Sequence, residues 1–72
     1  MKIEYDPKHD LMNIEFLADE PIADSLEING IILDYAADGR IVSIEILDVS
    51  EKTRKNPLAK LDFSIVRDAM PM

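Results

Sequence analysis

The turn after the first predicted strand holds the residues best suited to bind a metal ion. Asp6, His9 and Asp10 lie close together in the chain and carry the oxygen and nitrogen donors that divalent ions accept. The sequence contains only one histidine, and no fourth ligand is placed beside these three. The same residues suit a turn in which aspartate side chains accept backbone hydrogen bonds. We expect that structural role, and we predict no metal.

Nucleophilic catalysis has little support in the sequence. Ser25, Ser43, Ser50 and Ser64 are available, but a single His9 would have to activate one of them, and no Gly-x-Ser-x-Gly motif occurs. The absence of cysteine excludes a thiol nucleophile, a thiolate zinc site and disulfides. Two glycines cannot build a glycine-rich phosphate loop. We therefore predict no enzyme activity, no catalytic residue and no cofactor.

Paired carboxylates offer a further chemical possibility. Asp34 and Glu45 fall on neighbouring predicted strands, where two carboxyl groups that meet raise the pKa of one of them, as general acid–base catalysis requires. Asp34 and Asp38-Gly39 share some features of a calcium loop, but the spacing and the final glutamate are missing. On a sheet rich in acidic residues such pairs also arise by chance, so we assign these residues neither role.

Alternation of apolar and polar residues predicts five strands that would position these groups. Turn residues separate them: Asp6-Pro7 follows the first, and Asn29-Gly30 and Asp38-Gly39 suit tight hairpins in which both central residues need a positive φ. Connections this short leave no room for parallel crossovers, so we expect an antiparallel meander. The predicted strands span Lys2–Asp6, Leu11–Leu17, Ile22–Ile28, Ile31–Ala36 and Ile41–Leu47.

The alternation of apolar and polar residues that predicts strands ends at Asp48. This residue, with Glu51 three positions later, has the spacing of a capping box and predicts a short helix over about residues 49–56, which ends before Pro57. Residues 57–72 form a tail or a strand, since Leu61–Val66 alternates again. The expected fold is α+β and mainly β: a five- or six-stranded antiparallel meander sheet with one short C-terminal helix, in a single domain covering residues 1–72.

One face of this sheet lacks a cover. The helix segment offers only Val49 and Leu58 as large apolar side chains, which do not make an apolar stripe. The face itself holds nine large side chains: Ile3, Tyr5, Met12, Ile14, Phe16, Leu33, Val42, Ile44 and Ile46. We infer that a second chain, or Leu61–Val66 folding back, completes the core, and a symmetric homodimer is the simplest solution. The predicted interface residues are Phe16, Ile44, Leu61 and Phe63.

The charge is strongly negative and unevenly distributed. The net charge is -7, and a surface of that sign repels nucleic acids. Three basic and thirteen acidic residues precede Lys52, whereas five basic and two acidic residues lie from Lys52 onward. The acidic residues suit a solvated sheet face, or a docking surface for a small basic protein. With no leader-like segment and no apolar run long enough to span a bilayer, we expect a cytoplasmic protein without membrane contact.

Several motifs together resemble the prokaryotic family known as domain of unknown function 2283. They are Lys2-Ile-Glu-Tyr-Asp-Pro, Gly30-Ile-Ile-Leu-Asp-Tyr, Asp38-Gly-Arg-Ile-Val and Ile44-Glu-Ile-Leu-Asp. The resemblance covers about residues 2–52; the chain departs from the family pattern at His9, Leu11 and Asn13. The resemblance implies a small, mostly β protein without an assigned activity or cofactor. It also suggests an antitoxin-like partner of a small basic nuclease.

The sequence as a whole favours a non-enzymatic, homo-oligomeric protein–protein interaction module. The apolar sheet face without a cover is the reason for this prediction. The alternative is a small-ligand or metal-binding protein, or a minor enzyme, with a site at a subunit cleft near Asp6–Asp10.

Overall fold

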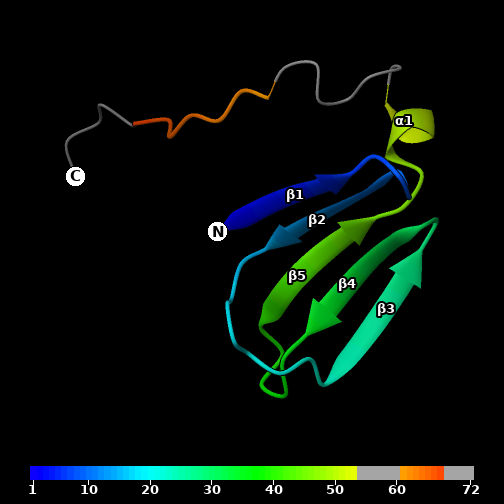
Figure 1. Cartoon of the computed structure of the whole chain (residues 1–72). Helices are drawn as coiled ribbons and strands as arrows, with labels where there is room; N and C mark the ends of the chain where they lie inside the picture. Colours follow the sequence, from blue (N-terminus) through cyan, green and yellow to red (C-terminus); the bar gives the residue numbers. More distant parts are fainter. Residues whose placement is uncertain (54–60, 68–72) are drawn as a thin grey trace.

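A computed structural model describes residues 1–53 and 61–67 of the chain (Figure 1). It contains one five-stranded sheet in which every neighbouring pair is antiparallel, followed by a single turn of helix. The predicted fold class, a mainly β antiparallel sheet with one short helix, is confirmed. The elements are β1 (Lys2–Asp6), β2 (Leu11–Glu15), β3 (Asp24–Ile28), β4 (Ile31–Tyr35), β5 (Ile41–Ile46) and α1 (Val49–Lys52).

The strand order is β1-β2-β5-β4-β3. The strands β3, β4 and β5 form a meander, and the last of them, rather than β3, lies beside β2. The connection over residues 16–23 passes the ends of β5 and β4 to reach the far edge (Figure 1). Three strand spacings are about 14 Å, and eight extended residues can span about 26 Å. The length of this connection therefore allows β5 to take the central position.

The two predicted hairpins form, but their turns differ. Asn29 and Gly30 have φ of 51° and 76°, as a type I′ turn between β3 and β4 requires. In the hairpin between β4 and β5 only Gly39 has a positive φ, of 90°. There the Ala36 amide donates to the Arg40 carbonyl at 2.8 Å, which closes a wider loop than the predicted two-residue turn.

The start of α1 is held by a distant residue. The prediction that Asp48 caps this helix was wrong, because Asp48 has φ 51° and its side chain makes no capping hydrogen bond. Instead the Asp10 carbonyl accepts from the Val49 amide at 3.1 Å, and the Asp10 carboxylate accepts from the Ser50 amide at 3.2 Å. The helix ends at Lys52, and the rest of its predicted extent, from residue 54, lies outside the described residues.

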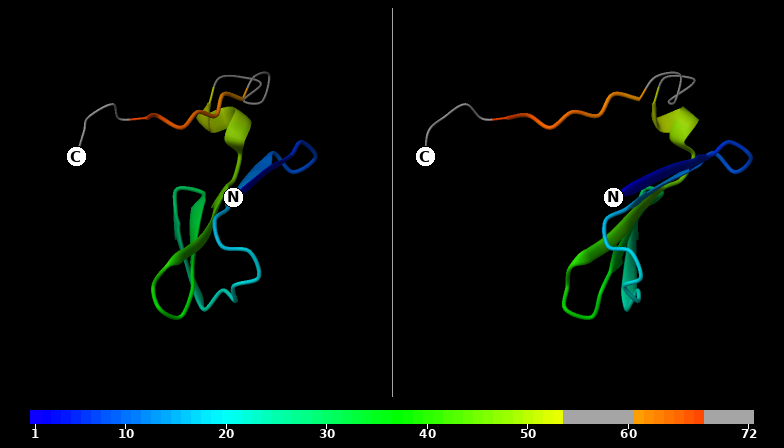
Figure 2. Two further views of the ribbon diagram at one scale, coloured as in Figure 1. Left: turned by 90° about the vertical axis from the view of Figure 1, so that its left-hand side faces the viewer. Right: turned by 60° about the vertical axis from the view of Figure 1, so that its left-hand side comes forward.

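The segment over residues 61–67 forms no strand and is exposed throughout. The sixth strand predicted over Leu61–Val66 is thus not formed, since no strand of the described sheet takes up its backbone hydrogen bonds. The segment lies away from the sheet, on the side of β1 and α1 (Figures 1 and 2). The remainder of the predicted 57–72 tail lies outside the described residues.

The described part of the chain has a very small core. Its only buried apolar residues are Ala36, Val42 and Val49, at 4%, 4% and 2% exposure. Figure 2 shows the reason: the sheet is a single twisted layer, and α1 lies beyond its end rather than over a face. No helix in the described ranges is long and apolar enough to cross a membrane.

Candidate functional site

A hydrogen-bond network centred on Asp10 joins the β1–β2 turn to α1. The Tyr5 hydroxyl donates to Asp10 Oδ1 at 2.7 Å, and the Ser50 hydroxyl donates to Asp10 Oδ2 at 2.5 Å. The hydrogen bonds from Ser50 and then Tyr5 lower the pKa of Asp10, and the same bond to Asp10 raises the pKa of Tyr5. Both carboxylate oxygens of Asp10 are therefore engaged in holding the helix.

Asp6 and His9 form a separate pair in the same turn. Asp6 Oδ2 lies 2.7 Å from His9 Nδ1, and Asp6 Oδ1 accepts from the Lys8 amide at 2.9 Å. The hydrogen bond to His9 is the main cause that lowers the pKa of Asp6. The predicted turn with aspartate-to-backbone hydrogen bonds is confirmed. Asp6, His9 and Asp10 are divided between these two networks, and no group of three metal-ligating side chains occurs among residues 1–53 and 61–67.

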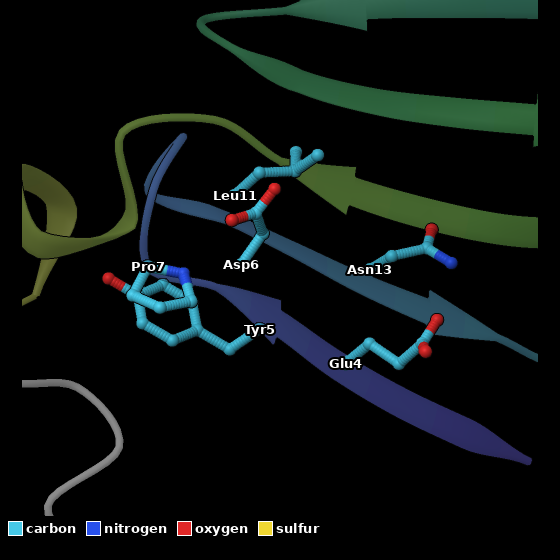
Figure 3. A pocket seen from close by; sticks show the side chains of 6 residues that line it. All are labelled: Glu4, Tyr5, Asp6, Pro7, Leu11 and Asn13. Carbon is cyan, nitrogen blue, oxygen red and sulfur yellow. The ribbon is translucent and has the colours of Figure 1, made fainter.

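A shallow hollow of about 390 Å³ lies beside this turn (Figure 3). Strand register sets its walls: Glu4 lies opposite Asn13, and Asp6 lies opposite Leu11. Its lining residues are Glu4, Tyr5, Asp6, Pro7, Leu11 and Asn13. Carboxylate and amide groups next to the side chains of Tyr5, Pro7 and Leu11 could bind a small molecule that carries hydrogen-bond donors.

A second polar cluster crosses three strands around Asp34, which is only 3% exposed. The Ser25 hydroxyl of β3 donates to Asp34 Oδ1 at 2.6 Å, and the Ser43 hydroxyl of β5 donates to Asp34 Oδ2 at 2.7 Å. Burial raises the pKa of Asp34, but the hydrogen bonds from Ser25, Ser43 and Glu45 together outweigh it, and the pKa lies below its ordinary value. The cluster ties β3, β4 and β5 together.

Glu45 completes this cluster. Its hydrogen bond with Asp34, followed by burial, raises the pKa of Glu45. The two carboxyl groups, which the sequence offered as a possible pair on neighbouring strands, meet in the structure, and the pKa of one is raised. They border a second hollow of about 430 Å³, walled by β2, β4, β5 and the connection over residues 16–23. The pair can share a proton, which is what acid–base chemistry would need.

Three of the four serines, Ser25, Ser43 and Ser50, are not arranged as nucleophiles, and Ser64 lies in the exposed segment over residues 61–67. Ser25 and Ser43 donate to Asp34, and Ser50 donates to Asp10, while His9 is paired with Asp6. The role of Ser25 and Ser43 was missed in the sequence. Both serines lie directly opposite Asp34 in the sheet. Their position opposite Asp34 follows from the register of β3, β4 and β5, and the sequence alone does not give that register.

The opposite side of the sheet carries a continuous apolar surface, which we call the apolar face. Side chains that oppose one another in register lie on the same side of a sheet, and two complete rows of such residues cross all five strands. The first row is Ile3, Ile14, Ile44, Leu33 and Leu26, and the second is Tyr5, Met12, Ile46, Ile31 and Ile28. None of these ten residues is fully buried.

The four predicted interface residues fall in different places. Ile44 is half-buried at the centre of the apolar face, on the central strand. Phe16 follows β2 and is 38% exposed. Leu61 and Phe63 are 59% and 68% exposed in the segment that lies away from the sheet. The structure thus places one of the four on the apolar face and leaves two apart from it.

Comparisons with known proteins identify the family only. No curated protein and no solved structure gives a significant match. A family model described as a protein of unknown function (DUF2283) matches residues 2–50, from the start of β1 into α1. The match contains both polar clusters and the whole apolar face, and the chain therefore belongs to the family of proteins of unknown function DUF2283.

Proposed function

We propose that this chain is a non-enzymatic, homo-oligomeric protein–protein interaction module. The observation that carries the proposal is the small core: three buried apolar residues in the described part of the chain, beside an apolar face of ten large side chains that no described element covers. Burial of such side chains is the main stabilising term in folding, at about 1.5–3 kcal/mol each. Association with another chain supplies the burial that a single chain lacks.

The polar clusters support a non-enzymatic role. Asp10 holds α1, Asp6 pairs with His9, and Asp34 joins three strands. Each of these carboxylates has hydrogen-bond partners whose effect is to fix the fold. The hydrogen bonds of Asp6, Asp10 and Asp34 are therefore accounted for by structural roles.

The proposal is tested by the mass and stability of the wild-type chain. Light scattering after size exclusion at micromolar concentration should give twice the 8.2 kDa chain mass, or a higher multiple. The urea midpoint of unfolding should rise with chain concentration, since association stabilises only the folded chains. A folded 8.2 kDa species whose midpoint does not change with concentration would refute the proposal.

A second candidate function is the binding of a small molecule in the 390 Å³ hollow at the β1–β2 hairpin. The hollow itself favours this candidate, with Glu4, Asp6 and Asn13 as its polar groups. A panel of small amines and divalent cations should then raise the melting temperature of the wild type, and Asn13→Ala should weaken that shift. Asp10→Ala is unsuitable for this purpose because Asp10 holds α1. If no compound shifts the wild type, this candidate fails.

A further inference from the structure

We propose that the apolar face is covered by the same face of a second copy of this chain, in a two-layer sandwich with its two-fold axis near Ile44. This inference rests on the proposed function and names the surface and the arrangement that it uses. Ile44 lies in the middle of the first row and on the central strand, so it marks the centre of the apolar face. A two-fold axis there brings each row against the matching row of the partner copy.

The area of the apolar face fits such a dimer. Five strands spaced by about 4.8 Å give a width of about 24 Å, and five residues give a length of about 17 Å. The flat footprint of this side of the sheet is then about 400 Å² on each copy, within the range of about 300–600 Å² of the largest apolar patch on a typical monomer, which is often functional. The two flat footprints together make about 800 Å². Interdigitated side chains bury more area than a flat footprint, which brings the interface toward the lower end of the range of about 1,200–2,000 Å² of stable interfaces.

The charge distribution favours face-to-face packing over other arrangements. The ten residues of the apolar face carry no formal charge, so the two rows bring no like charges together. Among the described strands, the one charged residue on the same side is Asp24, at the end of the edge strand β3 and opposite Tyr35. The other side of the sheet carries one basic residue, Lys2, and six acidic ones: Glu4, Asp6, Glu15, Glu27, Asp34 and Glu45. In the sandwich these acidic sides point away from each other. Repulsion between these acidic sides is then reduced by the thickness of the two layers.

The open edge of the sheet at β1 is less suited to joining two copies. The edge strand β1 alternates Lys2, Glu4 and Asp6 along one side, and charged residues of this kind discourage edge-to-edge pairing. Pairing at an edge would also leave the apolar face bare. Packed sheets lie about 10 Å apart with strands crossing at about 30°, an arrangement that covers both rows.

Substitutions at matched exposure test this surface. Leu26 lies on the apolar face and is 48% exposed, whereas Ile22 lines the hollow on the other side and is 53% exposed. Within a single chain the two side chains are about equally exposed, so replacing either of them with aspartate removes a similar amount of packing inside that chain. Leu26→Asp places two carboxylates in the dimer interface, one from each copy, and should raise the dissociation constant at least about 100-fold. Ile22→Asp and the conservative Leu26→Met should leave it within about threefold of the wild type.

Sedimentation equilibrium gives the dissociation constants. If Leu26→Asp unfolds because folding and association are coupled, the urea midpoints at several chain concentrations replace them. A midpoint for Leu26→Asp below those of Ile22→Asp and Leu26→Met at every concentration supports the sandwich. Equal effects of Leu26→Asp and Ile22→Asp in a chain whose wild type does associate would overturn the sandwich and leave the proposed function standing. A monomeric wild type would overturn both.

Discussion

Replacement of Ser43 by alanine should destabilise the fold through the buried Asp34 carboxylate. Ser43 is 6% exposed, and its hydroxyl donates to Asp34 Oδ2 at 2.7 Å. Ser43→Ala leaves that oxygen without its donor in a site that is 3% exposed, where solvent cannot easily replace it. A hydrogen bond to a charged group contributes about 1.5–3 kcal/mol. For a domain of this size the melting temperature should fall by about 6–24 °C.

The pH dependence of this effect is a further signature. The lowered pKa of Asp34 contributes stability above the unfolded pKa of the group, and this contribution is lost as the pH falls through the folded value. Ser43→Ala removes one of the bonds that lower this pKa, so the difference from the wild type should be largest at neutral pH and should shrink on acidification.

Urea unfolding at one fixed chain concentration measures the difference, with Ser25→Ala as the matched control. Ser25 makes the equivalent bond from the exposed edge strand β3, where water can replace its hydroxyl, so its loss should cost less. A Ser43→Ala protein within about 0.5 kcal/mol of the wild type at pH 7, or one no less stable than Ser25→Ala, would refute the reasoning.

Three other substitutions test separate parts of the structure. Glu45→Gln should stabilise the fold at pH 7 by about 0.2–1 kcal/mol. The raised pKa of Glu45 contributes stability that is full below the unfolded pKa and lost as the pH rises through the folded value. Glutamine stays neutral at pH 7 and so avoids this loss. Urea unfolding at pH 4 and pH 7 checks this, and Glu27→Gln, opposite an isoleucine, should lack the effect. Tyr5→Phe removes a donor to the carboxylate that holds α1, and hydrogen exchange should show faster exchange of the α1 amides; unchanged rates would contradict the anchoring role. Gly30→Ala should cost about 1–2 kcal/mol for the left-handed backbone. In thermal unfolding it should cost more than Gly39→Ala, because a Cβ at Gly30 would lie 2.8 Å from the Lys52 Nζ, whereas a Cβ at Gly39 would meet nothing within 4 Å. Equal losses would show that the lysine moves aside freely.

Much of the local structure could be predicted from the sequence. Period-two alternation identified all five strands, with ends that differ by up to two residues: the second ends at Glu15 rather than Leu17, and the third begins at Asp24 rather than Ile22. Asn29-Gly30 identified a type I′ hairpin, because few residue pairs adopt two positive φ values in succession. These features depend on neighbours in the chain and are therefore visible in the sequence.

Contacts between distant residues could not be predicted in the same way. Asp48 has the type and spacing of an N-cap, but Asp10 holds the helix instead, from a turn 40 positions before Ser50. The placement of β5 beside β2 likewise depends on a long connection that tolerates more than one strand order. Asp34 and Glu45 could be offered as a possible pair because both strands had already been placed as neighbours.

The sequence by itself determined which side chains share a side of each strand, because alternation along an extended chain follows from backbone geometry. It also determined the acidic composition and the shortage of apolar residues in the helix segment. Only the tertiary structure decided that ten apolar side chains line up as two unbroken rows across five strands, and that Ser25 and Ser43 flank a buried Asp34. The physical reason is register: a shift by one residue turns every side chain of a strand to the other face, and register is fixed by pairing between strands far apart in the chain.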